Sequence, residues 1–201
     1  GYLNFSAKSV WLSKSVMNLE PPIVEKEVLI EHTSANPNGP FHVGRARNAI
    51  LGDTLVRLNR LYGNNVRAEY YVDDMGKQVG VLAWALENLS KAQVDEILGD
   101  EDSVNPRWEG KKDHETVRWY QAAQNLRSQD GSEDIEAAIS KLVHASEHGD
   151  DSVLAQFEEA YKPVLDGMLE TLSRLGIEFD TFTKESKFVV DGSVSALMER
   201  L

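Results

Sequence analysis

Residues 27–48 read EVLIEHTSANPNGPFHVGRARN, a stretch that combines three successive local patterns. Its first six residues contain the apolar run Val28-Leu29-Ile30 with β-branched side chains, which predicts a buried strand over residues 27–32. Residues 33–40 contain almost only loop and turn formers. A helical pattern begins near Gly44. The stretch therefore predicts a strand that passes through a Pro- and Asn-rich loop into a helix.

The following residues repeat this order. One face of the first helix carries four apolar side chains spaced by four, three and four residues: Leu51, Leu55, Leu58 and Tyr62. Residues 63–65, Gly-Asn-Asn, favour a helix end, and residues 66–72 predict a second strand. After residues 73–76 a second helix carries Val79, Leu82, Leu86 and Leu89. Strand, helix, strand, helix indicates an α/β fold with a parallel sheet and right-handed crossovers.

Residues 91–150 break this rhythm and predict an acidic helical insertion, in which Trp108, Trp119 and Tyr120 indicate a small satellite core. Residues 144–148 match the H-x-x-E-H pattern of certain zinc peptidases, but no third ligand stands out, so we expect no metal site there. Residues 151–201 predict a return helix, a strand over residues 177–182 and the start of another helix near Ser195. The return helix carries an apolar stripe that Gly176 closes: Leu154, Phe157, Tyr161, Leu165, Met168, Leu172 and Leu175.

The composition restricts the location and the partners of the chain. Its 201 residues contain 33 acidic and 21 Lys or Arg side chains, a net charge of −12, and no cysteine. No run approaches the roughly 18 consecutive apolar residues of a membrane span, and the amino terminus has no export signal. We therefore expect a cytoplasmic protein without a membrane partner. Because RNA phosphates attract Lys and Arg, the acidic balance disfavours extensive RNA contact within this chain.

The junction of the first strand and helix carries the chemistry. Ligands of open α/β sheets bind at the carboxyl ends of strands, where a helix N-terminus offers free N–H groups and a partial positive charge to a phosphate. His42 and Arg45 add donors three residues apart, so both face the same oxygens. Gly44 lets a flat base or sugar approach the backbone. The sequence therefore predicts an anion site around His42.

Residues 36–45, NPNGPFHVGR, resemble the HIGH signature of class I aminoacyl-tRNA synthetases in the form used by archaeal-type arginyl-tRNA synthetases. Residues 31–34 and 47–53 also resemble that family, and residues 73–80, DDMGKQVG, resemble its Gly-Asp-Trp-Gly-x-Gln-x-Gly stretch. Close resemblance covers about residues 27–84. The chain departs from the pattern at Arg45, where most class I enzymes have a second His. It also lacks the second signature, KMSKS, at the position that the class requires.

The resemblance implies the N-terminal part of an incomplete catalytic domain with a Rossmann-type (HUP-like) parallel sheet and flanking helices. Residues 1–22 would be a connector from an upstream domain, because Pro21-Pro22 favours an extended chain. Residues 23–90 would hold the first βαβα part, with the helical insertion over residues 91–150 after it. Two alternatives remain open: another HxGH-type class I synthetase or nucleotidyltransferase, and a non-catalytic binding module derived from one.

By the same resemblance, the parent enzyme activates arginine with ATP to arginyl-adenylate and transfers it to tRNA(Arg), mainly bound by parts outside this chain. We expect the isolated chain not to be fully active. His42 and Arg45 would be catalytic. The residues implied in ATP binding are His42, Val43, Gly44, Arg45 and Asn48, with Mg²⁺ arriving on ATP and no metal ligand from protein side chains. The residues implied in arginine binding are Glu31, opposite the guanidinium, and Ser34, Asn36, Asp74 and Gln78. Asp74 has the alternative reading of a cap for the helix that follows it.

Overall fold

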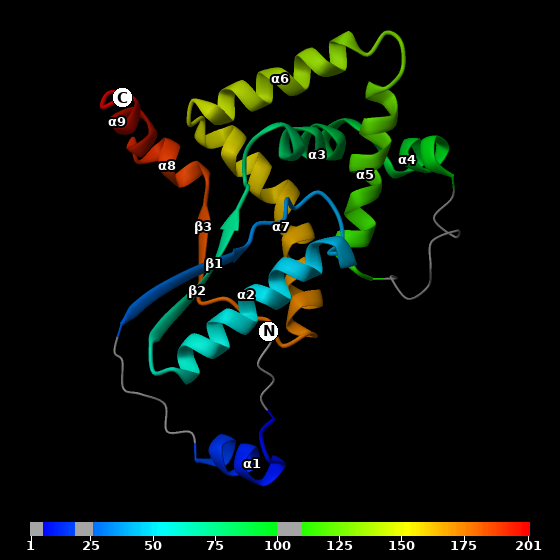
Figure 1. The fold of residues 1–201 in the computed structure, drawn as a ribbon. Coiled ribbons are helices and arrows are strands. Elements are labelled where there is room, and N and C mark those ends of the chain that lie inside the picture. Colours follow the sequence, from blue (N-terminus) through cyan, green and yellow to red (C-terminus); the bar gives the residue numbers. More distant parts are fainter. Residues whose placement is uncertain (1–5, 19–25, 100–109) are drawn as a thin grey trace, which may run out of the picture.

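The computed structural model describes residues 6–18, 26–99 and 110–201. At its centre is a parallel three-stranded sheet in the order β1-β2-β3, formed by β1 (Glu27–Thr33), β2 (Asn65–Val72) and β3 (Thr181–Lys184) (Figure 1). The helix α2 (Val43–Leu61) connects β1 to β2. The predicted parallel α/β fold is confirmed.

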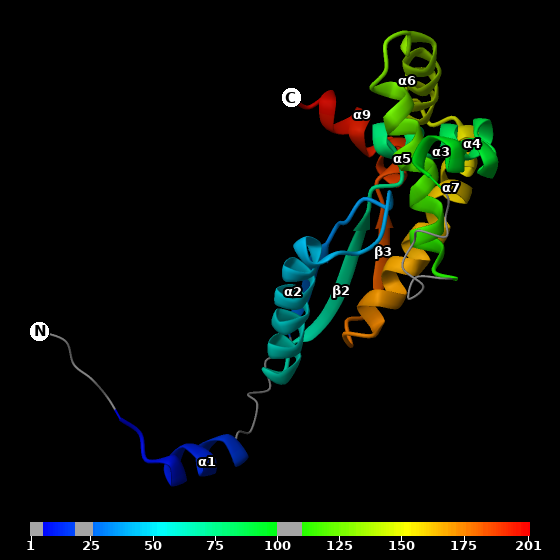
Figure 2. The same cartoon turned by 90° about the vertical axis from the view of Figure 1, so that its right-hand side faces the viewer.

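Helices cover both faces of the sheet. Figure 2 shows α2 on one side of the strands and the long helix α7 (Asp151–Ser173) on the other. The helix α3 (Lys77–Asn88) packs against α7 and against two helices of the predicted insertion, α5 (Lys112–Arg127) and α6 (Glu133–Glu147). The remaining helices are α1 (Ser9–Met17), α4 (Lys91–Leu98), α8 (Ser186–Val190) and α9 (Ser193–Met198).

The core has a main part and a satellite. In the main part Tyr70 and Val72 of β2 contact the stripe of α7, where Phe157, Val164 and Met168 are fully buried. Burial raises the pKa of Tyr70 to about 12, and its hydroxyl donates to the carbonyl of Ala35 at 2.9 Å. This bond ties the loop after β1 to the sheet.

The satellite core joins α3, α4, α5 and α6 around buried apolar side chains such as Val81, Val94 and Ile139. Trp119 and Tyr120 pack against it, as predicted. Trp108, the third aromatic residue of that prediction, lies outside the described residues.

Two burial predictions are wrong. The strand β1 lies at the sheet edge and alternates in exposure, with Leu29 52% exposed. The predicted apolar face of α2 is exposed, whereas Ala49, Gly52 and Val56 form its buried face. The buried face of α2 consists of small residues because α2 lies very close to β1. A Cβ on Gly52 would lie 2.0 Å from the Cβ of His32.

The segment boundaries also differ near both ends of the chain. The connector predicted over residues 1–22 contains the helix α1, while Pro21 and Pro22 lie outside the described residues. The strand predicted over residues 177–182 begins at Thr181, because the Asp180 carboxylate accepts from the Ala68 N–H at 2.7 Å in place of a backbone oxygen. The helix expected from Ser195 to the last residue spans Ser193–Met198.

Candidate functional site

His42 is the N-cap of α2 and stands where the loop after β1 becomes helical. Its Nδ1 accepts from the N–H of Gly44 at 3.1 Å. In the neutral ring the proton is then on Nε2, which is free to donate away from the helix. His42, Val43 and Gly44 are exposed, so this helix N-terminus is open to an anion.

Arg45 braces the loop that precedes it. Its guanidinium donates to the carbonyl of Asn36 at 3.0 Å and to Oδ1 of Asn38 at 3.1 Å. The amide of Asn38 in turn donates to Gln78 at the start of α3. The sequence analysis assigned Arg45 to ATP binding and assigned Asn36 and Gln78 to arginine binding. Asn38, which was not among the predicted site residues, links Arg45 to Gln78, and Arg45 also contacts the Asn36 carbonyl.

Asp74 is buried, with 5% of its surface exposed. Its carboxylate accepts from the backbone N–H of Ser186 at 2.9 Å and from the Ser186 hydroxyl at 2.6 Å. It therefore holds the start of α8 against the end of β2. The reading of Asp74 as a cap for the following helix is wrong, because the N-cap of α3 is Gly76, which receives no side-chain cap.

Carboxylates gather beyond the carboxyl ends of β2 and β3, and Asp73, Glu185 and the neighbouring Tyr71 form what we call the anionic cluster. Burial, and then the charge of Asp74, raise the pKa of Asp73. Burial, and then the charge of Asp73, raise the pKa of Glu185. Tyr71 also has a raised pKa, because of burial and then the charge of Glu185. Within the described residues, the charges that shift these three pKa values all belong to Asp or Glu, so the cluster suits a cationic group.

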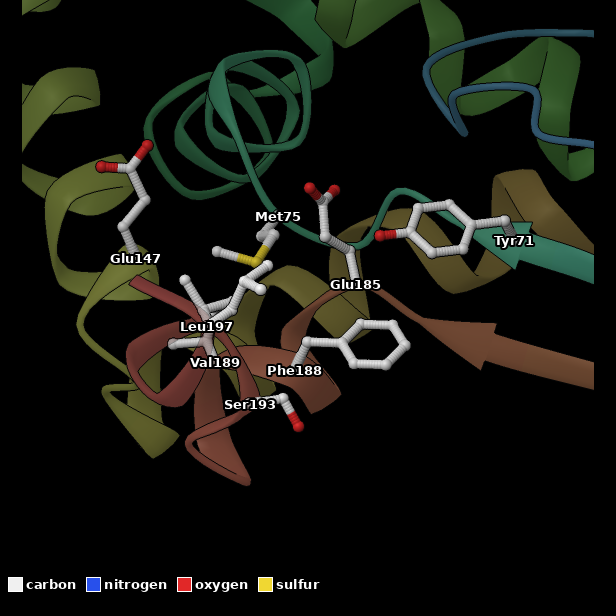
Figure 3. Close-up of a pocket in the computed structure, with 9 residues that line it drawn as sticks. Tyr71, Met75, Glu147, Glu185, Phe188, Val189, Ser193 and Leu197 are labelled. Atoms are coloured by element: carbon white, nitrogen blue, oxygen red, sulfur yellow. The ribbon is translucent and has the colours of Figure 1, made fainter. Parts of the chain in front are cut away.

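A cavity of about 530 Å³ adjoins this cluster. Figure 3 shows the Tyr71 hydroxyl directed toward Glu185, with Met75 and Phe188 beside them and Glu147 across the cavity. The sequence did not reveal Tyr71 or Glu185. The usable signal was the position of Glu185 directly after a strand, but the strand had been expected to end at residue 182.

The other predicted arginine-binding residues lie near the ends of the strands. Glu31 is exposed on β1 opposite Glu69 of β2, and its charge contributes to the raised pKa of Tyr71. Ser34 follows on the exposed side of the loop, and Asn48 is exposed on α2. Glu31 thus belongs with the anionic cluster, whereas Asn48 lies on the helix that His42 opens.

Among the described residues there is neither a metal-binding cluster nor a membrane-spanning helix. Within residues 6–18, 26–99 and 110–201 no three His, Asp or Glu side chains are arranged to hold a metal ion. The rings of His144 and His148 stack, with centroids 4.1 Å apart, instead of converging on a common point with a third ligand. In the same described ranges no helix has the length and apolar character needed to cross a bilayer.

The chain has an α/β fold of the class in which a helix N-terminus follows the first strand of a parallel sheet, an arrangement that binds nucleotide phosphates in other proteins. The model of the family "tRNA synthetases class I (R), catalytic domain" matches residues 10–179. This chain belongs to that family, the catalytic domains of class I arginyl-tRNA synthetases.

Similar proteins agree with this assignment. The chain is 41% identical to an arginine–tRNA ligase of Methanocella arvoryzae over 200 residues, which cover 100% of the chain and 33% of that protein. It is 36% identical to an arginine–tRNA ligase of Methanothermobacter thermautotrophicus over 201 residues, with the same coverage of both. Among solved structures, the Thermus thermophilus arginyl-tRNA synthetase matches with a TM-score of 0.66 and 27% identity, over 98% of this chain and 31% of that one. The chain thus spans about a third of the length of these relatives.

Proposed function

We propose that this chain is the ATP- and arginine-binding part of an arginine–tRNA ligase. In the first step an arginine carboxylate oxygen attacks the α-phosphate of ATP, forming arginyl-adenylate and releasing pyrophosphate. In the second step a terminal ribose hydroxyl of tRNA(Arg) attacks the activated carbonyl and releases AMP. Its relatives carry the name of this activity, and tRNA charging would place the protein in the cytoplasm.

The observation that carries this proposal is the open N-terminus of α2 at His42. The Nε2 proton of His42 and the backbone N–H of Val43 would donate to ATP phosphates as charge develops on them. The N–H of Gly44 already donates to His42, so Gly44 would contribute by letting the nucleotide approach the backbone closely. Arg45 would act mainly by fixing the loop that bounds the site, and Asn48 would extend the site along α2. Because the described residues offer no metal site of their own, Mg²⁺ would arrive on the ATP phosphates.

For arginine, the anionic cluster supplies the counter-charge. A guanidinium beside Glu31, Asp73 and Glu185 would offset the burial, and then the carboxylate repulsion, that raise the pKa values of Asp73 and Glu185. Ser34 and Asn36 would bind the amino acid end of the substrate. Gln78 would border this pocket from α3, and Asp74 would shape it by holding α8.

A charging assay on the natural full-length protein, with ATP, tRNA and each amino acid in turn, tests the proposal. We expect arginine to be charged in preference to all others, and His42→Ala to lower the rate about 10²- to 10³-fold, as losing one donor to developing charge does elsewhere. His148→Ala, at the exposed end of α6, is the control and retains full activity. Preference for another amino acid would favour a different class I synthetase, and no charging at all would favour a non-catalytic module.

A further inference from the structure

The loop between β1 and α2 alternates in burial along its length. Asn36 and Asn38 are half-buried, whereas the residues that flank and separate them are buried: Ala35, Pro37, Gly39 and, further on, Phe41. Gly39 packs so closely against α5 that a Cβ there would lie 2.8 Å from a methyl carbon of that helix. Because one side of the loop is fixed against the protein, the other side presents its two asparagines at a defined position.

Asn38 bonds to the first turns of two different helices. Its Oδ1 accepts from the guanidinium of Arg45 in α2 at 3.1 Å, and its amide N–H donates to Oε1 of Gln78 in α3. Its backbone N–H donates at 2.8 Å to the carbonyl of Asn36, which also accepts from Arg45 at 3.0 Å. One side chain therefore joins the start of α2, at the proposed ATP site, to the start of α3.

The start of α3 depends on contacts with other elements. Its N-cap is Gly76, at a φ of 88°, and glycine has no side chain with which to cap the helix. Two side chains of the first turn are instead held from outside, since Lys77 pairs with Glu136 of α6 at 3.0 Å and Gln78 accepts from the loop. Asp73 of the anionic cluster lies in the short segment that precedes this turn. The position of Gln78 therefore affects that of the proposed arginine site.

The start of α2 would respond to ATP in a corresponding way. Phosphates held at His42 would lie beside the first turn of α2, to which Arg45 belongs. Phosphate charge attracts a guanidinium, so bound ATP limits the positions that Arg45 and its partners in the loop adopt. A bridge between partly exposed side chains costs conformational entropy. A ligand that orders one end of such a bridge lowers the cost of ordering the other end.

We infer that Asn38 is a positioning residue that couples the binding of ATP to the binding of arginine. This inference rests on the proposed function. ATP orders Arg45 and with it the Asn38 amide, which holds Gln78 and the start of α3 in the arrangement that binds arginine. By linkage, arginine increases the affinity for ATP by the same factor. The bridge also sets the separation of the two ligands, on which the attack of the carboxylate on the α-phosphate depends.

Calorimetry on the natural full-length protein tests this coupling. The ligands are arginine and α,β-methylene ATP, in which a methylene replaces the bridging oxygen that leaves with pyrophosphate, so that no adenylate forms. In the unchanged protein saturating arginine should tighten binding of the analogue about fivefold, at the lower end of typical coupling between sites. In Asn38→Ala the ratio of the two affinities should fall to about one, because the bridge is lost.

Asn88→Ala is the matched control. Asn88 is exposed at the far end of α3, and its amide donates to the carbonyl of Trp84 within the same helix at 2.8 Å. The substitution thus removes an asparagine side chain from α3 without touching the bridge. Asn88→Ala should keep the ratio of the unchanged protein.

Gln78→Met breaks the same bridge from the side of α3. Gln78 is exposed, and methionine is similar in length, so the variant should fold with a Tm within about 2 °C of the unchanged protein. It removes the acceptor of the Asn38 amide, and the ratio should again fall to about one, whatever the change in arginine affinity itself. If Asn38→Ala lowers the Tm by more than this margin, Gln78→Met decides the question.

The same titrations separate the inference from the proposed function. A ratio in the two bridge variants equal to that of the unchanged protein would overturn the inference. So would a loss of analogue affinity in Asn38→Ala that is equal with and without arginine, because Asn38 would then support the ATP site alone. If the unchanged protein binds both ligands independently, the inference fails and the proposed function stands. If it binds neither ligand, the proposed function fails and the inference fails with it.

Discussion

The anionic cluster differs in its assembly from a groove of about 1040 Å³ whose lining includes Lys111, Arg118 and Arg174. Asp73 and Glu185 meet because β2 and β3 are neighbours in the sheet, although they lie far apart in sequence. In that groove Arg118 lies in α5, Lys111 directly precedes α5 and Arg174 directly follows α7, and these two helices pack against each other. Sheet topology therefore gathers the carboxylates, whereas helix packing gathers the cations. A net charge of −12 agrees in sign with the anionic cluster but gives no indication that helix packing gathers Lys111, Arg118 and Arg174.

The groove side depends on a buried ion pair, and breaking it should have the largest effect on stability. Asp113→Ala leaves the Lys111 ammonium without its counter-charge, so we expect the free energy of unfolding to fall by about 3 kcal/mol. Urea denaturation measures this change. Asp134→Ala, an exposed acid in the first turn of α6, is the control and should cost less than about 1 kcal/mol. A loss for Asp113→Ala no larger than the control's would show that Lys111 is held without its counter-ion.

The cluster side depends on a single buried carboxylate. Asp74→Ala removes both bonds to Ser186, so it should lower the free energy of unfolding by about 2 kcal/mol and weaken arginine binding by displacing α8. Denaturation and calorimetry with arginine measure the two effects. Asp74→Asn retains one acceptor and should lose about half as much stability. If Asp74→Ala binds arginine as tightly as the unchanged protein, α8 does not shape the arginine pocket.

The smallest effect concerns the pH dependence of the cluster. The folded-state pKa of Glu185 is raised, so its ionisation destabilises the fold at neutral pH, and the protein gains stability as the pH falls through that pKa. Glu185→Gln should therefore raise the Tm at pH 7.5 by about 2 °C, and the gain should shrink as the pH falls towards the ordinary carboxyl range. Thermal melts across this range measure it. A gain that does not vary with pH would contradict the electrostatic cause.

Much of the fold was predictable because it is encoded in local patterns. The β1–α2 and β2–α3 units follow from alternating runs of strand formers, turn formers and helical periodicity. The buried face of α2 was not predicted, because the prediction followed the spacing of large apolar residues along the helix. The close approach of α2 to His32 instead selects Ala49 and Gly52, and no property of α2 alone reveals that approach.

The candidate site divides in the same way. His42 and Gly44 are predictable, since the strand end, the turn-rich loop and the helix start all lie within one continuous stretch. The positions of Glu185 and Arg174 are not predictable from local sequence. That of Glu185 depends on which strands pair, and that of Arg174 depends on where α7 ends relative to the loop before α2. The bond from Asp74 to Ser186 spans 112 residues, a distance in sequence over which local patterns carry no information.

The claim that the N-terminus of α2 holds the ATP phosphates is tested most directly by the affinity of His42→Asn for ATP. Asparagine is a good N-cap, so this variant keeps the start of α2 while it removes the Nε2 donor. Calorimetry on the natural full-length protein should show ATP binding at least about tenfold weaker, the loss expected for a charge-assisted hydrogen bond, with an unchanged Tm. ATP binding as tight as in the unchanged protein would contradict the assignment of His42.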